Sequence, residues 1–210
     1  MHIPKKFRQV DTNKLIALIK DFPFATLIGS NESGAQVMHL PLLIKNEDEQ
    51  SVTLNGHIAK VNPFWQQIKQ GDKVVAVFHG PNCYISPNHY PTKLEHGKAV
   101  PTWNYVVVHA EGNIKFCHDE EWLHSHIDEL SQQHEQKSEK PWSINDAPED
   151  YIQKMLPAIV GIEISINNIE GQWKLSQNQP EKNQQGVIQG LMDSENPNAQ
   201  AIAKMMLTQQ

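Results

Sequence analysis

The sequence predicts an antiparallel β-barrel or sandwich with helices at its periphery. Six or more strand-like segments follow one another through short polar links, an order typical of hairpins and meanders. Helical patterns stand at the ends of the chain or in excursions between strands, so the strand–helix–strand alternation of a parallel sheet is not expected. A chain of 210 residues is long enough to bury a sizeable core as one domain.

The first half of the chain alternates strands with short helices. Apolar residues of segment 11–22 fall mostly on one helical face, and Pro23 ends the helix. Asn62 and Pro63 can cap and begin a short helix that ends at Gly71. Four strands and two turns are expected in this half, the strands at 24–30, 36–45, 51–56 and 73–78 and the turns at 31–34 and 46–50.

The second half has the same alternation and ends in a polar tail. We expect strands at 83–86, 105–111 continued by 112–115, 158–166 and 173–175, with a turn at 167–171. We expect helices at 119–134, 146–156, 187–191 and 199–207. The strands therefore predict a barrel domain over residues 1–178. Residues 179–210 are expected to form a helical tail packed on the barrel or on a partner.

Composition and charge narrow the possible partners. The net charge is −6, so the whole chain has no electrostatic footprint for DNA or anionic lipid. Cys83 and Cys117 do not make a disulfide framework and are expected to be reduced and buried. The start of the chain lacks the pattern of a signal peptide, and no apolar run reaches the ~20 residues that span a bilayer. We expect a cytoplasmic protein that does not enter the membrane.

Motifs for metal, covalent and nucleotide chemistry are not found. The eleven histidines lack metal-ligand spacing, and there is no HExxH or Cys/His quartet. No GxSxG elbow surrounds a serine, and neither GxGxxG nor GxxxxGK[ST] is present. We therefore expect no metal and no Rossmann or P-loop site, and the catalytic residues stay unknown.

Aromatic, amide and histidine side chains gather at strand ends. The segments that carry them are 39–41 (HLP), 55–60 (NGHIAK), 84–87 (YISP), 100–105 (VPTWNY) and 174–178 (KLSQN). This mixture suits a planar heteroaromatic ligand that carries an anion, because rings stack on rings and amides satisfy polar edges. Singly, Trp103, Tyr105, Tyr84 and His39 fit packing roles equally well, and Lys174 fits an ordinary surface lysine.

These segments resemble the PaiB-type family of FMN-binding negative transcriptional regulators. The resemblance covers nearly the whole chain, including MHIPKKF at the start, GHIAKVNP at 56–63, VFHGPNCYISPNHY at 77–90, VPTWNYVVVHAEG at 100–112 and WKLSQNQP at 173–180. It implies a β-rich α+β fold, an antiparallel split β-barrel with peripheral helices, and a homodimer with FMN at its interface.

The resemblance also implies a set of cofactor-binding residues. Residues 37–40 are expected beside the flavin ring, with His57 and Lys60 at the phosphate. Trp103, Asn104 and Tyr105 are expected in the ring pocket or from the partner subunit. The full expected set is Val37, Met38, His39, Leu40, His57, Lys60, Asn62, Tyr84, Ser86, Trp103, Asn104, Tyr105, Lys174, Gln177 and Asn178.

The chain departs from the family pattern at four positions. Lys60 stands where the family commonly has Arg and lacks the bidentate fork of a guanidinium. His89 stands in place of Trp, and Gln172 and Gln179 replace basic residues. Three functions stay open: a regulator, a flavin-dependent oxidoreductase with His39, Tyr84, Tyr105 or His109 as proton donor, and a barrel that has lost its cofactor. Direct DNA binding is possible but is not supported by the charge.

Overall fold

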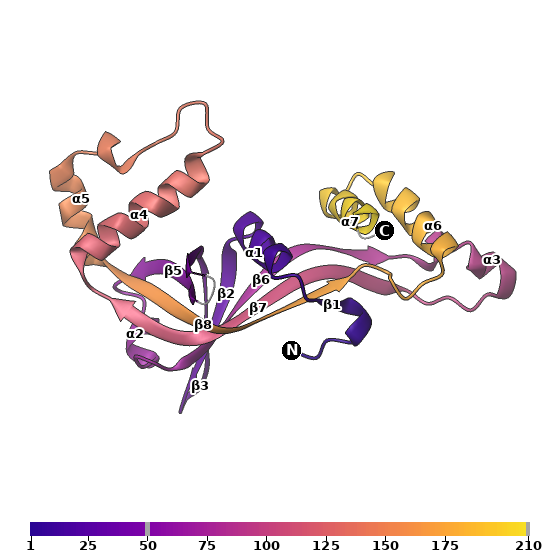
Figure 1. Ribbon diagram of the computed structural model, residues 1–210, viewed down its shortest axis with the longest axis horizontal. Helices are drawn as coiled ribbons and strands as arrows, with labels where there is room; N and C mark the ends of the chain where they lie inside the picture. The colour runs from indigo at the N-terminus through magenta and orange to yellow at the C-terminus, as the bar shows by residue number, and fades with distance from the viewer. Residues whose placement is uncertain (49–50, 209–210) are drawn as a thin grey trace. The chain divides into compact units, whose positions relative to one another are not determined.

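The computed structural model describes residues 1–48 and 51–208, whose strands form one antiparallel sheet (Figure 1). The strands are β1 (Arg8–Gln9), β2 (Phe24–Asn31), β3 (Gly34–Pro41), β4 (Leu43–Asp48), β5 (Ser51–Ala59), β6 (Lys73–Ile85), β7 (Thr102–Cys117) and β8 (Ile159–Lys174). The α-helices are α1 (Thr12–Asp21), α2 (Phe64–Gln67), α3 (Thr92–His96), α4 (Glu120–Glu135), α5 (Glu149–Met155), α6 (Glu181–Met192) and α7 (Pro197–Leu207). Short 3-10 turns are η1 (Lys5–Phe7), η2 (Pro87–His89), η3 (Ile144–Asp146) and η4 (Leu156–Ala158).

Neighbouring strands follow the order β3-β2-β6-β7-β8-β5-β4, and β1 pairs with β8. Each register determined is antiparallel. Within the described residues β3 and β4 stand at the two ends of this path, so the sheet is not closed. The predicted β-rich fold class with peripheral helices is therefore confirmed.

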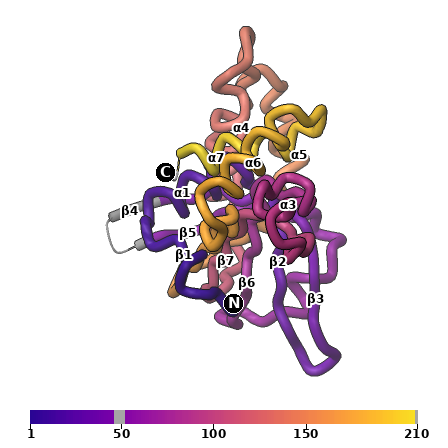
Figure 2. Tube along the Cα trace, turned by 90° about the vertical axis from the view of Figure 1, so that its right-hand side faces the viewer, coloured from indigo at the N-terminus to yellow at the C-terminus, as the bar shows by residue number. Residues whose placement is uncertain are grey.

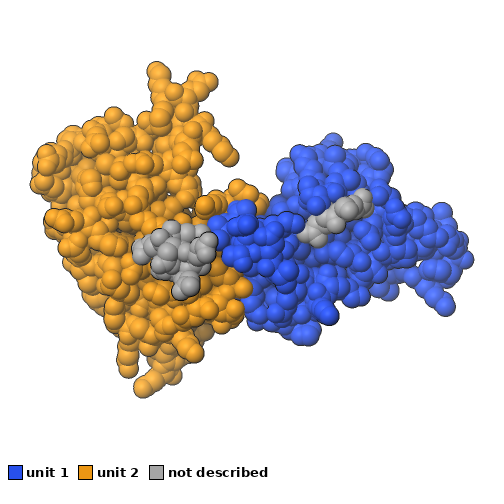
Figure 3. All heavy atoms as spheres, viewed as in Figure 1, with its two compact units in different colours: residues 1–18, 78–109, 170–210 blue, residues 19–77, 110–169 orange. Residues whose placement is uncertain are grey.

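The chain forms two compact units (Figure 3). Unit 1 comprises residues 1–18, 78–109 and 170–210, and unit 2 comprises residues 19–77 and 110–169. The three long strands β6, β7 and β8 contribute residues to both units. The separation of a barrel at 1–178 from a tail at 179–210 stays a prediction.

Unit 2 contains two hairpins and the helical excursion between β7 and β8. The β2–β3 hairpin pairs without interruption from Phe24 opposite Pro41 to Asn31 opposite Gly34 (Figure 2). β5 pairs with β4 on one side and with β8 on the other. α4 packs against β5, and α5 leads through η4 into β8. The core contains the fully buried side chains Ile19, Leu27, Leu42, Leu54, Ile68, Ile114, Leu123, Ile162 and Ile164.

Unit 1 is built on the adjoining ends of β6, β7 and β8. α6 and α7 lie together on one face of these strands (Figure 1). Asn104 on β7 is fully buried there and contacts Ser176 and Met206. The tail helices are longer than predicted, since α6 begins at Glu181 and α7 at Pro197.

Several predicted boundaries are wrong because pairing overrides local composition. The predicted turn at 167–171 lies inside β8, where the backbone of Gly171 pairs with Gln9 of β1. The predicted strand 36–45 divides at Leu42, whose backbone N–H bonds to the carbonyl of Pro23. In the predicted turn 46–50, residues 46–48 belong to β4, and residues 49–50 lie outside the described residues.

Two predicted helices are shorter than expected. The helix expected to end at Gly71 has only four residues, Phe64–Gln67. The helix expected at 146–156 is divided, because η3 ends at Asp146 and Pro148 precedes α5 in an extended conformation. Proline favours the first turn of a helix but removes a backbone donor inside it, which explains why the helix restarts after Pro148. The predicted helix at 119–134 is confirmed as α4.

Candidate functional site

The fifteen predicted site residues divide between the two units. Unit 2 holds Val37, Met38, His39, Leu40, His57, Lys60 and Asn62. Unit 1 holds Tyr84, Ser86, Trp103, Asn104, Tyr105, Lys174, Gln177 and Asn178. The surroundings of each set show which of these side chains are available to a ligand and which are occupied within the fold.

The four predicted residues on β3 alternate between the two faces of the strand. Val37 is 56% exposed and His39 is exposed, whereas Met38 and Leu40 are buried. This alternation follows from the two-residue period of a strand. Met38 and Leu40 can therefore contact a ligand only through their backbone, while Val37 and His39 present side chains.

His39 belongs to an exposed face of the β2–β3 hairpin. Its Nδ1 lies 3.1 Å from Oγ1 of Thr26, its cross-strand partner. Its ring also stacks on Phe24, with 6.3 Å between ring centroids, and Phe24 is 65% exposed. Thr26 and Phe24 are not among the predicted site residues, although the expected pairing of strands 24–30 and 36–45 could have placed them beside His39.

His57 on β5 is half-buried and meets α4. Its Nδ1 lies 3.2 Å from Nε2 of His126, within hydrogen-bond distance. Burial lowers the pKa of His57. The pKa of His126 falls to about 3, mainly through burial and further through the nearby charges of His57 and Lys45. Both rings are therefore neutral at pH 7.

Lys60 and Asn62 lie in the turn after β5. The ammonium of Lys60 is exposed, while its backbone carbonyl accepts a hydrogen bond of 2.9 Å from Nε1 of Trp65. The side-chain oxygen of Asn62 accepts a hydrogen bond of 3.0 Å from the backbone N–H of Phe64. The side chain of Asn62 thus accepts a hydrogen bond from the first residue of α2. The ammonium of Lys60 is exposed and can contact an anion.

Unit 1 carries an aromatic shelf, which we define as Tyr84, Trp103 and Tyr105. Tyr84 is 51% exposed and Trp103 48% exposed, and their rings meet edge to face with centroids 6.2 Å apart. Nε1 of Trp103 donates a hydrogen bond of 3.3 Å to Oδ1 of Asn82. An open surface pocket of about 330 Å³ lies at the shelf, lined by His79, Gly80, Asn82, Trp103, Tyr105, Val106 and Val107.

Lys174 adds a positive charge to the aromatic shelf. Its ammonium donates a hydrogen bond of 2.7 Å to Oγ1 of Thr102 and lies 6.0 Å from the centroid of Tyr105. That distance is at the limit of a cation–π interaction. Lys174 on β8 is therefore held beside a ring of β7 and is not a freely moving surface lysine.

Three other predicted residues of unit 1 are engaged in the fold itself. The hydroxyl of Ser86 caps η2 by accepting a hydrogen bond from the backbone of Asn88. The amide of Asn104 donates to Ser176 at 2.9 Å in the core. Gln177 bonds to backbone atoms of its own turn. Asn178 is exposed.

The side chains available to a ligand fit the parts of FMN. Exposed aromatic faces suit a flavin ring, since aromatic pairs stack favourably. Asn82 and Tyr84 offer polar groups of the kind that orient a heteroaromatic edge. Lys60 in unit 2 offers the positive charge that suits a phosphate. Each unit therefore offers side chains that suit one part of this cofactor.

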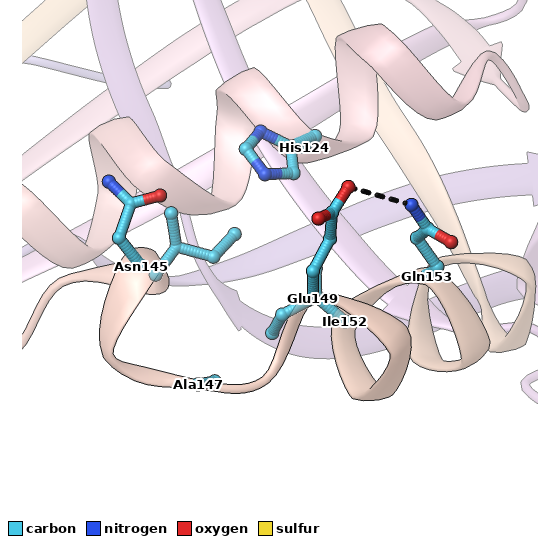
Figure 4. Close-up of a pocket in the computed structure, with 7 residues that line it drawn as sticks. His124, Asn145, Ala147, Glu149, Ile152 and Gln153 are labelled. Carbon is cyan, nitrogen blue, oxygen red and sulfur yellow. Dashed lines mark hydrogen bonds between the residues drawn. The ribbon is translucent and has the colours of Figure 1, made fainter.

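A separate pocket lies between α4 and α5 within unit 2 (Figure 4). It has a volume of about 410 Å³ and is lined by His124, Ile144, Asn145, Ala147, Glu149, Ile152 and Gln153. Glu149 and Gln153 are hydrogen-bonded side by side on α5 and face His124 of α4 (Figure 4). All its polar side chains are exposed. The pocket is thus a surface groove and not an enclosed site.

Among residues 1–48 and 51–208, no helix is both long and apolar enough to cross a bilayer. No three His, Cys, Asp or Glu side chains among the described residues gather as a metal site. Cys83 and Cys117 are buried free thiols, as predicted, and burial raises the pKa of Cys83 to about 11.

The antiparallel sheet with its peripheral helices places the chain in the split-barrel fold class. The family model described as "Putative FMN-binding domain" matches residues 1–168. The chain belongs to this family, and FMN is its cofactor.

Relatives and solved structures agree with this assignment. Protease synthase and sporulation protein PAI 2 of Bacillus subtilis (strain 168) is 30% identical over 206 residues, covering 98% of this chain and 96% of that protein. An uncharacterized protein of Emericella nidulans is 32% identical over 225 residues, covering 90% of each chain. A FAD- and haem-binding protein from Mycobacterium smegmatis has a similar fold, with a TM-score of 0.56, 10% identity and coverage of 87% and 80%. A flavocytochrome from Azotobacter vinelandii also has a TM-score of 0.56 with 10% identity, covering 82% and 72%. The predicted split-barrel class is confirmed by these folds.

Proposed function

We propose that this chain is a homodimeric, FMN-binding negative regulator of transcription of the PaiB type, acting in the cytoplasm. The observation that carries the proposal is the end-to-end match to PAI 2 of Bacillus subtilis, which includes the segments of the aromatic shelf and of Lys60. The relative's name connects it with protease synthesis and sporulation, and the regulatory part of the proposal comes from the resemblance of the motifs to the PaiB-type family.

Within this proposal Lys60 of one subunit binds the phosphate of FMN, and the aromatic shelf of the partner subunit binds the flavin ring. Trp103 and Tyr84 supply exposed ring faces, and Lys174 holds a positive charge beside Tyr105. His57 supplies a neutral N–H donor to the phosphate. FMN supplies redox chemistry when bound, whereas these side chains bind, orient and exclude water. A homodimer covers the exposed apolar side chains of the shelf and of the β2–β3 hairpin.

Titration with FMN tests the ring assignment. Purified protein should quench flavin fluorescence with saturation, and Trp103→Ala should weaken the affinity about tenfold, because one base-sized ring stacked on an aromatic side chain contributes roughly 1–3 kcal/mol. Trp142→Ala is the matched control, since Trp142 is 41% exposed in unit 2 and lies outside the shelf. Equal weakening by both variants would contradict the assignment.

Two further measurements test assembly and role. Light scattering should give a dimer mass, and a monomer that still binds FMN would contradict the dimeric proposal. Deleting the gene should raise the level of the repressed transcripts, and returning the intact gene should lower it again. If repression requires flavin binding, the Trp103→Ala variant should not lower it. The oxidoreductase alternative would be favoured instead by bleaching of bound flavin with NAD(P)H and a small-molecule acceptor.

A further inference from the structure

The layer between β5 and α4 is polar although it is deeply buried. Thr53, Asn55 and His57 follow one another at alternate positions of β5 and so share one face. Thr53 is 9% and Asn55 4% exposed, and His126 of α4 is 1% exposed. Oγ1 of Thr53, Oδ1 of Asn55 and Nδ1 of His126 have no hydrogen-bond partner among the described residues. Such groups are costly to bury, which indicates a role other than core packing.

Three rings join the helix to the strand in this layer. The ring of Trp122 stacks on that of His126, with centroids 5.2 Å apart and planes inclined by 21°. His126 then meets His57 edge to face at 5.3 Å between centroids. Trp122 and His126 are one helical turn apart, so both lie on the buried side of α4. His57 therefore contacts His126, and Trp122 of the same helix stacks on His126.

The contact between the two histidines selects a tautomer. Two neutral rings share one proton across the 3.2 Å contact between Nδ1 of His57 and Nε2 of His126. If His57 donated, the proton of His126 would sit on Nδ1, which is buried and has no partner. Orphaned buried N–H groups are rarer than under-satisfied acceptors. The favoured arrangement is therefore donation by Nε2–H of His126 to Nδ1 of His57.

We propose that His126 is a positioning residue that holds His57 in the Nε2–H tautomer, so that His57 offers an N–H donor to the phosphate of FMN. The proposal rests on the assignment of His57 to the cofactor phosphate made above. A ring nitrogen's partner commonly fixes the role of the other nitrogen in this way.

The charged groups around the pair are consistent with two neutral rings. Lys45 of β4 forms an ion pair with Glu129 of α4, one turn along from His126. Lys45 adds to the lowering of the pKa of His126. The neighbours on β5 are the uncharged Thr53 and Asn55. Because an imidazolium is disfavoured here, His57 acts through a directed hydrogen bond and not through charge.

Nuclear magnetic resonance of the ring nitrogens tests the tautomer without FMN. The expected result is a protonated Nε2 on His126, an unprotonated Nδ1 on His57, and a two-bond 15N–15N coupling between them. A proton on Nδ1 of His57 would overturn the proposal. His126→Phe should abolish the coupling while keeping an aromatic ring against Trp122.

Cofactor titration tests the positioning role. His126→Phe should weaken FMN binding about tenfold, by analogy with metal-binding histidines, where loss of the orienting partner costs roughly 10–100-fold in affinity. His126→Gln should bind FMN more tightly than His126→Phe, because its amide can donate a hydrogen bond to His57. His124→Phe is the matched control, since His124 lies on the exposed side of the same helix. Circular dichroism should show that all three variants fold.

The two proposals fail in different ways. If His57→Ala weakens FMN binding but His126→Phe binds as the unaltered protein does, the positioning role is rejected and the phosphate assignment stands. If the coupling is present but His57→Ala binds FMN unchanged, the phosphate assignment is rejected and only the histidine contact survives.

Discussion

At the scale of single residues, His126 links folding to pH because its ring is buried as a neutral base. Its pKa is about 3 in the folded chain and 6.5 when unperturbed, with burial as the main cause. Below pH 6.5 the unfolded chain takes up a proton that the folded chain does not. The contribution of neutral His126 to the free energy of unfolding is therefore complete above pH 6.5 and is lost progressively as the pH falls towards 3.

Urea denaturation between pH 7 and pH 5 checks this prediction. The free energy of unfolding should be about 2 kcal/mol lower at pH 5 than at pH 7. Between its folded and unfolded pKa, one such histidine lowers this free energy by about 1.4 kcal/mol for each unit that the pH falls. The His126→Phe variant should show a flatter profile. Identical slopes for both proteins would show that His126 is not the group responsible.

The same scale shows why the sequence alone does not separate ligand-facing side chains from packed ones. One motif places Trp103, Asn104 and Tyr105 together in the predicted site, yet Asn104 is a core amide bonded to Ser176. His126 is two residues from His124, a spacing that suits no metal site on a helix, so the sequence does not single it out. The signal for its role was its place one turn after Trp122 on the buried face of the helix.

At the scale of elements, a glycine in β8 allows α4 to lie close to the sheet. A Cβ at Gly161 would clash with the ring of Trp122 and would also approach Cys117. Gly161→Ala should therefore lower the free energy of unfolding by about 1–3 kcal/mol, the usual cost of overpacking, and weaken the contact between α4 and β5.

A double variant tests whether the clash is the cause. Trp122→Leu combined with Gly161→Ala should recover part of the loss, because the smaller side chain leaves room for the new methyl group. Thermal and urea denaturation of the two single variants and the double variant give the interaction energy. Strictly additive losses would mean that Gly161→Ala acts elsewhere.

Element types were predictable where local signals were strong. Residues close together in the sequence determine three of these features: the apolar face of α1, the Asp119 cap of α4 and the continuous pairing of β2 with β3. The full length of β8 was not predictable. Residues 167–171 have the composition of a turn, but they belong to the strand because it pairs with residues distant in the chain. Local composition cannot report such pairing.

At the scale of the whole molecule, the net charge of −6 is unevenly divided. Unit 1 carries nine Lys and Arg against six Asp and Glu, whereas unit 2 carries nine against eighteen. Any direct contact with DNA should therefore use unit 1, because phosphates are repelled by a strongly acidic surface.

A gel shift across a salt series checks this prediction. Direct binding should weaken steeply with salt, and replacing the exposed residues Lys5 and Lys6 by Gln should reduce the slope. The double replacement of Lys137 and Lys140 in unit 2 is the matched control for charge. Binding that is absent or insensitive to salt would mean that repression is indirect.

The sequence by itself determined the β-rich class, the peripheral helices, the family and the cofactor, because alternation, caps and contiguous motifs are local properties. Only the tertiary structure decided which side chains of each motif face solvent, as with Val37 and His39 against Met38 and Leu40. It also brought together His57 and His126, which are 69 positions apart. Such contacts depend on strand register and helix packing, and their free energy comes from residues that are not neighbours in the chain.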